Sequence, residues 1–228
     1  MGASSGLGAE LARLYQAAGH EVACAARKVE QIGPCKAKAS IDINAADAAN
    51  QLLALIEELG GMDLYIHVSG IGYDNPALNI ERELQIIETN ALGFARMIST
   101  AFNWFAQHGK QGHIAAVTSV AGTKGLGGME AYSASKRFGS TYLQALLQRA
   151  VTSGLKISIT DIRPGWTRTP LLKPGQKYPL LMQPGRVCRK IFRAINRHKR
   201  TAIIDERWAA LVAIWRLIPD IIWRHIKV

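Results

Sequence analysis

The sequence predicts an α/β fold in which helices flank a doubly wound, mostly parallel sheet. Two observations carry this prediction. Short apolar runs alternate along the chain with longer segments of helical periodicity, as expected when a helix connects each strand to the next. In addition, a glycine-rich turn opens the chain and leads directly into an amphipathic segment at residues 7–18. The length of 228 residues fits a single domain, residues 1–228.

The apolar runs and the periodic segments place the elements in order. We expect strands at residues 21–26, 38–43, 63–70, 113–117, 156–162 and 203–204. We expect helices at residues 7–18, 45–59, 81–108 and 186–200. The third of these helices should be continuous and should carry one apolar face, made of Leu84, Ile87, Ala91, Phe94 and Ile98.

One strand of such a fold is missing from the sequence. In a doubly wound sheet a central strand precedes the glycine turn, yet only Met1 precedes Gly2 here. Either the sequence is a clipped part of a longer chain or the sheet has lost its middle strand. The clipped interpretation is favoured, because a lost middle strand would leave backbone groups unpaired on both neighbouring strands.

Composition limits the partners and the compartment. The formal net charge of +11 favours an anionic partner, such as a phosphorylated cofactor, an acidic carrier, anionic lipid or nucleic acid, but no nucleic-acid motif is visible. The three cysteines lack C-x-x-C spacing, which favours reduced thiols over disulfides or a zinc site. The apolar run at residues 208–215 is shorter than the ~20 residues of a spanning helix. We therefore expect a cytoplasmic protein that is at most peripheral to a membrane.

The glycine-rich turn has the composition of a phosphate-binding loop. Glycines let the backbone approach a pyrophosphate, and the free N–H groups at the start of the following helix attract it. The residues expected to bind a cofactor here are Gly2, Ser4, Ser5, Gly6, Leu7 and Gly8. The alternative is an ordinary tight loop.

A tyrosine and a lysine four residues apart indicate acid/base chemistry. Tyr132 and Lys136 share one face of a helix-compatible segment. A lysine charge about 4 Å from the phenol would lower its pKa by about 3 units. Tyr132 would then serve as a general acid/base near neutral pH. Ser119 follows the strand expected at residues 113–117, so it would sit at the carboxyl end of that strand. The alternative for Tyr132 and Lys136 is that they lie on a solvated helix face.

These motifs resemble those of the short-chain dehydrogenase/reductase family over nearly the whole chain. The glycine motif matches at Gly2, Gly6 and Gly8, the serine at Ser119, the Tyr-x-x-x-Lys motif at Tyr132 and Lys136, and a Pro-Gly turn at Pro164 and Gly165. The resemblance implies a Rossmann-like fold and four catalytic residues, Ser119, Tyr132, Lys136 and Asn90.

The resemblance also implies how a dinucleotide is held. Asp42 and Ile43 would contact the adenine, and Ser69 and Gly70 the ribose on the nicotinamide side. Lys136 would bind the nicotinamide ribose beside Tyr132, and Asn90 would kink its helix and reach the lysine through a water. The Pro-Gly turn would meet the carboxamide through Pro164, Gly165, Thr167 and Thr169. Asp42 has a second interpretation, as a cap of the helix that follows it.

One family motif is altered in this chain. The family usually has Asn-Asn-Ala-Gly where this sequence has His67-Val68-Ser69-Gly70, so the local hydrogen bonding must differ. His67 falls within a strand pattern, which favours a structural role over a catalytic one.

Arg27 and Lys28 follow the second expected strand and bear on cofactor choice. An acidic residue at this place binds the ribose 2′-hydroxyl of NAD, whereas an arginine suits the 2′-phosphate of NADP. We therefore expect NADP(H) to be favoured over NAD(H). Ser5 does not supply the basic residue that some NADP-dependent relatives carry in the glycine turn, and the alternative is a pair of solvated turn residues.

Two segments late in the chain are rich in apolar residues. Residues 166–183 are proline-punctuated and suit a substrate lid over an apolar substrate, or else a packed surface loop. Residues 186–200 carry seven cationic residues and an apolar stripe, which indicates a helix with one buried face and one solvent-exposed, cationic face. The tail, residues 207–228, mixes tryptophans with arginines; it could lie on a membrane surface, although packing on another subunit or over the active site is favoured.

The predicted function is NADP(H)-dependent interconversion of a ketone or aldehyde with an alcohol, with Tyr132 as general acid/base. The expected substrate is a small apolar molecule, and the expected assembly is a homodimer or homotetramer. The alternatives are a non-catalytic NADP-binding sensor or scaffold, and a basic protein that binds membranes or nucleic acid. A peripheral membrane contact through the tail is compatible with the enzyme.

Overall fold

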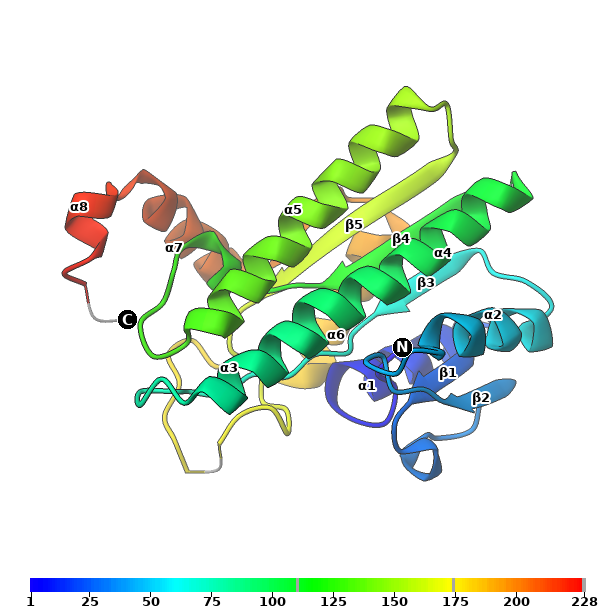
Figure 1. The fold of residues 1–228 in the computed structure, drawn as a ribbon, viewed down its shortest axis with the longest axis horizontal. Coiled ribbons are helices and arrows are strands. Elements are labelled where there is room, and N and C mark those ends of the chain that lie inside the picture. Colours follow the sequence, from blue (N-terminus) through cyan, green and yellow to red (C-terminus); the bar gives the residue numbers. More distant parts are fainter. Residues whose placement is uncertain (110, 174, 227–228) are drawn as a thin grey trace.

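The computed structural model describes residues 1–109, 111–173 and 175–226. Within these ranges the strands are β1 (Ala23–Ala26), β2 (Ala37–Ser40), β3 (Leu64–His67), β4 (Gly112–Val117), β5 (Ile157–Pro164) and β6 (Thr201–Ile204). The α-helices are α1 (Gly6–Ala17), α2 (Ala48–Leu59), α3 (Ile80–Ile87), α4 (Phe94–His108), α5 (Glu130–Thr152), α6 (Pro184–Asn196), α7 (Glu206–Leu217) and α8 (Asp220–Trp223). The shorter helical elements are η1 (Val29–Gln31), η2 (Glu88–Gly93) and η3 (Val120–Thr123). Figure 1 shows their arrangement.

Every strand pairing in the described part of the chain is parallel, which confirms the expected α/β fold. The strands β3-β4-β5-β6 form one sheet in this order, and β1 and β2 form a second, smaller one. The two sheets are linked through Met1 and Gly2. The Met1 carbonyl accepts from the Val68 N–H at 3.0 Å, and the Gly2 N–H donates to the Ala25 carbonyl at 2.7 Å. The glycine turn thus starts between β1 and β3.

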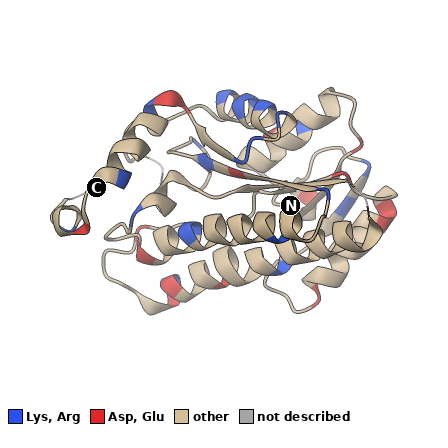
Figure 2. Ribbon diagram, turned by 90° about the horizontal axis from the view of Figure 1, so that it is seen from above, with Lys and Arg blue, Asp and Glu red and all other residues tan. Residues whose placement is uncertain are grey.

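Helices cover both faces of the larger sheet, and each face has its own hydrophobic core. One core packs α2, α4 and α5 against the sheet. The other packs α1, α6 and α7 against the opposite face. Figure 2 shows the strands between these layers, with the row of cationic residues on α6 facing outward. All six residues of β4 are buried, as expected for a central strand that is covered on both faces.

The long helix expected at residues 81–108 is interrupted. It consists of α3, a π-helical turn (η2) and α4. A π turn inserts a residue into the helix and so rotates the following side chains by about 100°. The apolar face expected to run from Leu84 to Ile98 is therefore wrong: Leu84 and Ile87 are exposed, whereas Glu83, Ile86 and Asn90 are buried.

The tail packs on the loop that precedes α5. The Trp223 indole N–H donates to the Gly125 carbonyl at 2.8 Å, and Lys124 forms an ion pair with Asp220 at 2.7 Å. The rings of Trp215 and Trp223 meet edge to face. No helix in the described ranges is both long enough and apolar enough to cross a bilayer. The last two positions of the predicted tail, 227 and 228, lie outside the described residues.

Candidate active site

A cavity of about 1080 Å³ runs along the carboxyl ends of β1 to β5. It is lined by most of the residues that the sequence singles out. These are Gly2, Ser4, Ser5, Gly6, Leu7, Arg27, Lys28, Asp42, Ile43, Ser69, Gly70, Ser119, Tyr132, Lys136, Pro164, Gly165, Thr167 and Thr169. The structure thus brings together, from one end of the sheet, residues that lie far apart in the sequence.

The two remaining predicted residues, Gly8 and Asn90, lie just beneath the cavity wall. A side chain at position 8 would place its Cβ 2.0 Å from the Gly2 carbonyl oxygen, so only glycine allows α1 to start so close to the turn. Asn90 is buried in the π turn. Its side-chain amide donates to the Ile71 carbonyl at 2.7 Å and to the Ser135 hydroxyl at 3.2 Å. Its oxygen accepts from the Ile71 N–H at 2.9 Å.

Ser119 follows β4 and is held at the start of η3. Its Oγ accepts from the Ala121 N–H at 3.1 Å and donates to the Pro164 carbonyl at 3.4 Å. The same hydroxyl lies close enough to the Tyr132 phenol to lower the pKa of Tyr132. Ser119 and Tyr132 therefore form one polar pair that faces the cavity.

Burial raises the pKa of Tyr132, and the Ser119 hydroxyl lowers it in part. The net shift is upward, so the expectation that Lys136 would lower this pKa is wrong for this structure. The physical reason is that desolvation disfavours the phenolate strongly. Because its pKa lies above the ordinary value near 10, Tyr132 is protonated at neutral pH and able to donate a proton.

Lys136 is buried one helical turn after Tyr132. Burial lowers its pKa to about 8, although the nearby Asp161 carboxylate raises it in part. The ammonium donates to the Val117 carbonyl at 3.3 Å. Asp161 is itself held by an ion pair with Arg163 at 2.6 Å and by a hydrogen bond from the Thr118 hydroxyl.

Glycines let the backbone come close to these side chains. A Cβ at Gly72 would lie 2.7 Å from the Tyr132 ring, and one at Gly70 would lie 3.2 Å from both the Lys136 ammonium and the Asn90 side-chain oxygen. A Cβ at Gly165 would lie 2.1 Å from the Trp208 ring. Bulkier residues at these positions would displace the tyrosine or the tail.

His67 is fully buried and lies outside the cavity wall. Its Nδ1 lies 3.1 Å from the Tyr65 hydroxyl, and its ring meets Phe94 edge to face. Burial lowers its pKa well below the ordinary range. The histidine therefore packs in the core, in agreement with the structural role that the sequence favours.

Asp42 is at the cavity, where its carboxylate accepts from the Asn44 N–H at 3.0 Å. The helix that follows begins at Ala48, after Asp47. The alternative role of Asp42 as the cap of this helix is therefore wrong.

Sequence reasoning missed a buried polar network at the start of α5. The Glu83 carboxylate accepts from the Asn75 side chain at 2.7 Å and from the Ala131 N–H at 2.9 Å. The Asn75 N–H donates to the Gly128 carbonyl at 2.7 Å. No local pattern in the sequence singles out Glu83. The network anchors the first turn of α5 directly before Tyr132.

The apolar end of the cavity is formed by late segments of the chain. Residues 166–183 contribute Trp166, Leu171, Leu172, Tyr178 and Pro179. Their ends are joined by a bridge between Thr167 and Met182. The tail contributes Trp208, Leu211 and Trp215, so its inner face packs over the cavity. The sequence considered this placement for the tail but did not identify these three residues as lining.

Fold and cavity together define a doubly wound α/β protein with its site at the carboxyl ends of parallel strands. The family model of the short chain dehydrogenases matches residues 1–178. The chain belongs to the short-chain dehydrogenase/reductase family and is an oxidoreductase.

Relatives and solved structures agree with this assignment. The chain is 35% identical over 196 residues to an uncharacterized oxidoreductase of Myxococcus xanthus, covering 80% of this chain and 76% of that protein. It is 30% identical over 240 residues to an uncharacterized oxidoreductase of Mycobacterium tuberculosis, covering 98% and 94%. Its fold is similar to that of a short chain dehydrogenase from Burkholderia cenocepacia in complex with NADP, with a TM-score of 0.81, 20% identity and 96% of each chain covered.

Proposed function

We propose that this protein is an NADP(H)-dependent reductase that interconverts a ketone or aldehyde with an alcohol. The observation that carries this proposal is that Ser119, Tyr132 and Lys136 line one end of a long cavity together. The solved structures of similar fold include complexes with NADP and with NADH, which supports a nicotinamide cofactor.

The residues of the cavity fit a dinucleotide. The glycine turn and the start of α1 offer backbone N–H groups to a pyrophosphate, and the close approach of Gly2 and Gly8 leaves this wall free of side chains. Arg27 and Lys28 stand at the far end, where they would hold a 2′-phosphate and favour NADP(H). Asp42 and Ile43 would hold the adenine, and Ser69, Gly70 and Lys136 the ribose on the nicotinamide side. Pro164, Gly165, Thr167 and Thr169 would hold the carboxamide.

The reduced nicotinamide, when bound, supplies a hydride to the carbonyl carbon. Tyr132 then donates its proton to the carbonyl oxygen as the general acid. Because its pKa is raised, the phenol is still protonated at neutral pH before this step. Ser119 donates a hydrogen bond to the same oxygen and holds it beside the phenol. The charge of Lys136 stabilises the phenolate that remains, and Asn90 keeps the surrounding backbone in place through Ile71.

The apolar end of the cavity supports an apolar substrate. Tyr73, Leu126, Met129, Trp166, Leu171 and Trp215 line this end. We propose that residues 166–183 act as the lid over the substrate, because they join this wall and carry the exposed Leu171.

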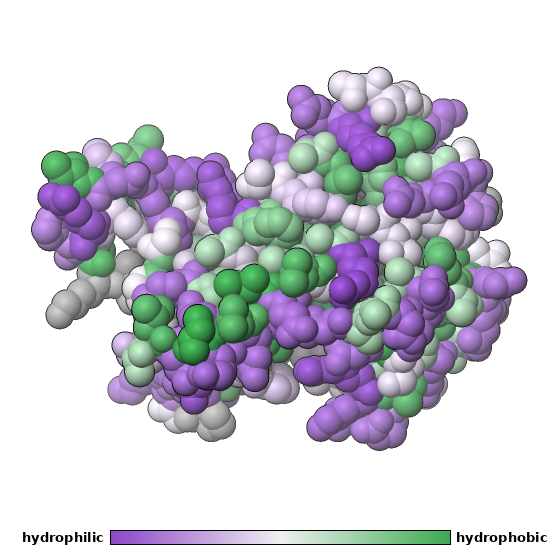
Figure 3. Space-filling view, viewed as in Figure 1, coloured by the Kyte–Doolittle hydropathy of each residue, from purple (hydrophilic) through white to green (hydrophobic). Residues whose placement is uncertain are grey.

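Two surfaces support proposed partners. A row of exposed apolar side chains, Ile80, Leu84, Ile87 and Leu92, lies on α3 and η2 and suits a second copy in a homodimer or homotetramer. Figure 3 shows hydrophobic side chains gathered on this face. Sedimentation velocity, which measures the oligomeric state, tests the proposed self-association through α3 and η2.

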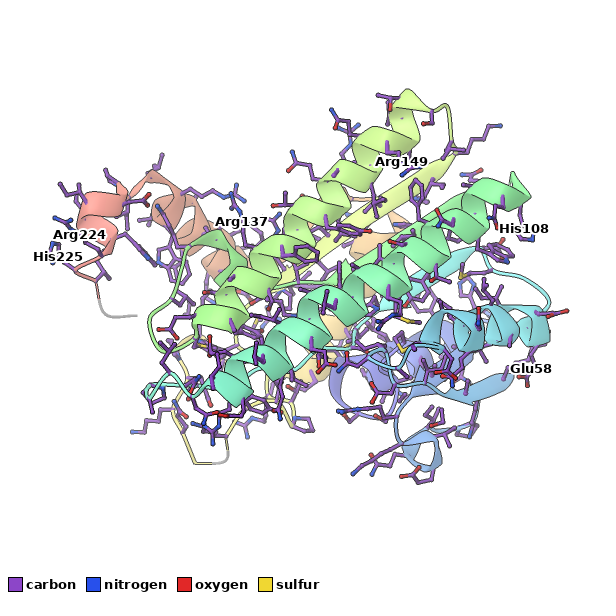
Figure 4. The ribbon with its side chains drawn as sticks, viewed as in Figure 1. Glu58, His108, Arg137, Arg149, Arg224 and His225 are labelled. Atoms are coloured by element: carbon purple, nitrogen blue, oxygen red, sulfur yellow. The ribbon has the colours of Figure 1, made fainter. Side chains whose placement is uncertain are left out.

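The outer side of the tail exposes Leu217, Ile221 and Ile222, with Arg224 and His225 at its end (Figure 4). This combination suits peripheral contact with an anionic membrane.

A panel of ketones and aldehydes, assayed with NADPH and with NADH by the absorbance of the reduced cofactor, tests the proposed function. We expect turnover of apolar carbonyl compounds and a lower KM for NADPH. Binding of NADPH without oxidation by any carbonyl would instead support the non-catalytic sensor. A preference for NADH would contradict the role of Arg27 and Lys28.

A further inference from the structure

Two thiols that take no part in the proposed reaction lie against each other beside the loop that carries Arg27 and Lys28. Cys24 on β1 is buried, and Cys35, just before β2, is half-buried. Cys24 belongs to a small hydrophobic core against which Cys35 packs, and the Cys35 Sγ–H donates to the Ala37 carbonyl at 3.2 Å. The third cysteine, Cys188, is buried in a different core, where its Sγ lies 3.6 Å from the Leu7 carbonyl.

The two cysteines bracket the loop at its base. Between them the chain leaves β1, passes Arg27 and Lys28, forms η1 and returns to β2 (Figure 1). The Lys36 N–H donates to the Val22 carbonyl at 2.9 Å beside the cysteine pair. The Ser40 hydroxyl on β2 donates to the Arg27 carbonyl at 3.0 Å. Because Ser40 is bonded to the Arg27 carbonyl, a shift of β2 against β1 would also move the backbone of Arg27.

We propose that Cys24 and Cys35 form a reversible oxidation site, at which a peroxide closes a disulfide that repositions Arg27 and Lys28. The half-exposed Cys35 thiolate attacks the peroxide: an S–O bond forms, the O–O bond breaks and one water leaves after protonation. Cys24 then attacks the Cys35 sulfur: the S–S bond forms, the S–O bond breaks and a second water carries away the Cys24 proton. The two thiols lose two electrons and two protons in total, and the peroxide is reduced to two waters.

The order of the two steps follows from exposure. Burial raises the pKa of Cys24 to about 12, and the neighbouring Cys35 adds to this shift. Cys24 is thus inert until a sulfur oxidised beside it offers a target, whereas Cys35 reaches solvent. A disulfide requires the two Cα atoms to lie about 4.4–6.8 Å apart. Bond formation would therefore fix the separation at the base of the loop and constrain the positions of Arg27 and Lys28.

The consequence for the nucleotide rests on the proposed function. If Arg27 and Lys28 hold a 2′-phosphate, the disulfide should weaken NADPH binding about tenfold, the size expected for losing one charge-assisted hydrogen bond. Binding of NADH, which lacks this phosphate, should change little. A reductant such as dithiothreitol should restore the NADPH affinity.

The test begins with hydrogen peroxide added to the reduced protein. Non-reducing peptide mapping by mass spectrometry should show a peptide pair joined through Cys24 and Cys35, lighter by two hydrogen atoms. Cys35→Ser should abolish this pair, and the matched control Cys188→Ser should retain it. NADPH and NADH dissociation constants are then measured by calorimetry on the reduced, oxidised and re-reduced protein.

Each outcome is decisive for one of the two proposals. Failure to form the bond in wild-type protein, or a bond through Cys188 instead, overturns the oxidation site whatever the enzyme does. A Cys24–Cys35 bond with unchanged NADPH affinity overturns its effect on Arg27 and Lys28. If neither form binds NADPH, the proposed function fails, while the mapping still decides whether the disulfide forms.

Discussion

The Lys136 ammonium lies 5.7 Å from the centre of the Tyr132 ring, one turn further along α5. It donates a hydrogen bond to the Val117 carbonyl, while the Ser119 hydroxyl lies close to the phenol. The phenol thus has its polar partner in Ser119, while Lys136 lies over the face of the ring. This division of roles underlies the first two predictions.

Tyr132→Phe should lower kcat for carbonyl reduction by about 10²–10⁴-fold, the usual contribution of a general acid. The ring would still fill its site, so the affinity for NADPH should remain. Steady-state kinetics and calorimetry measure the two effects. Tyr142→Phe is the matched control on the same helix, because the Tyr142 hydroxyl contacts Ser99 away from the cavity. Undiminished turnover in Tyr132→Phe would refute the proposed mechanism.

The activity should fall as the pH rises through about 8. The pKa of Lys136 is lowered to about 8, so its stabilising charge is present below this pH and lost above it. Tyr132 stays protonated over this range because its pKa is raised. A kcat/KM profile in the direction of reduction should show this limb. Lys136→Arg, which keeps its charge, should move the limb to higher pH even if the rate is lower. A limb that stays in place would assign it to another group.

Arg27→Ala should weaken NADPH binding about tenfold and leave NADH binding nearly unchanged, because only NADPH offers a 2′-phosphate to the guanidinium. Calorimetric titration of both cofactors measures this difference. Lys36→Ala removes an exposed cation, paired with Glu21, from the neighbouring strand region and serves as control. Equal losses for both cofactors would show that Arg27 does not select between them.

Glu83→Leu should destabilise the protein by about 1–3 kcal/mol, because it leaves the Ala131 N–H and the Asn75 side chain without their buried acceptor. The first turn of α5 should loosen, and kcat should fall more than the NADPH affinity. Thermal unfolding and kinetics measure the two effects, and Glu83→Gln, which keeps one of the two acceptor oxygens, should restore them only in part. Glu81→Gln, two residues earlier on the exposed side of α3, should be neutral.

Leu217→Glu combined with Ile221→Glu should abolish cosedimentation with vesicles that contain anionic lipid, because both side chains are exposed on the outer side of the tail. Val151→Glu is the control, since Val151 is 69% exposed, close to the 66% of Ile221, but lies at the far end of α5. Wild-type protein that stays in the supernatant would exclude the membrane contact.

The sequence by itself determined the fold class, the order of the elements and most of the cavity wall. These features follow from local patterns: glycines where the backbone turns tightly, apolar runs that become strands, and motif residues placed just after those runs. Ser119 and Arg27, which each follow a strand, line the same cavity because the carboxyl ends of parallel strands share one edge of the sheet.

Only the tertiary structure decided the features that depend on burial and on distant contacts. The π turn of η2 changed the phase between α3 and α4, so that Leu84 is exposed although Phe94 and Ile98 are buried, and hydrophobic periodicity does not register such a turn. Burial shifted the pKa of Tyr132 upward, against the charge argument that spacing alone suggests. Packing between segments that no local pattern connects also decided two further features. Trp208 and Trp215 of the tail line the cavity, and Cys35 packs against the small core that contains Cys24.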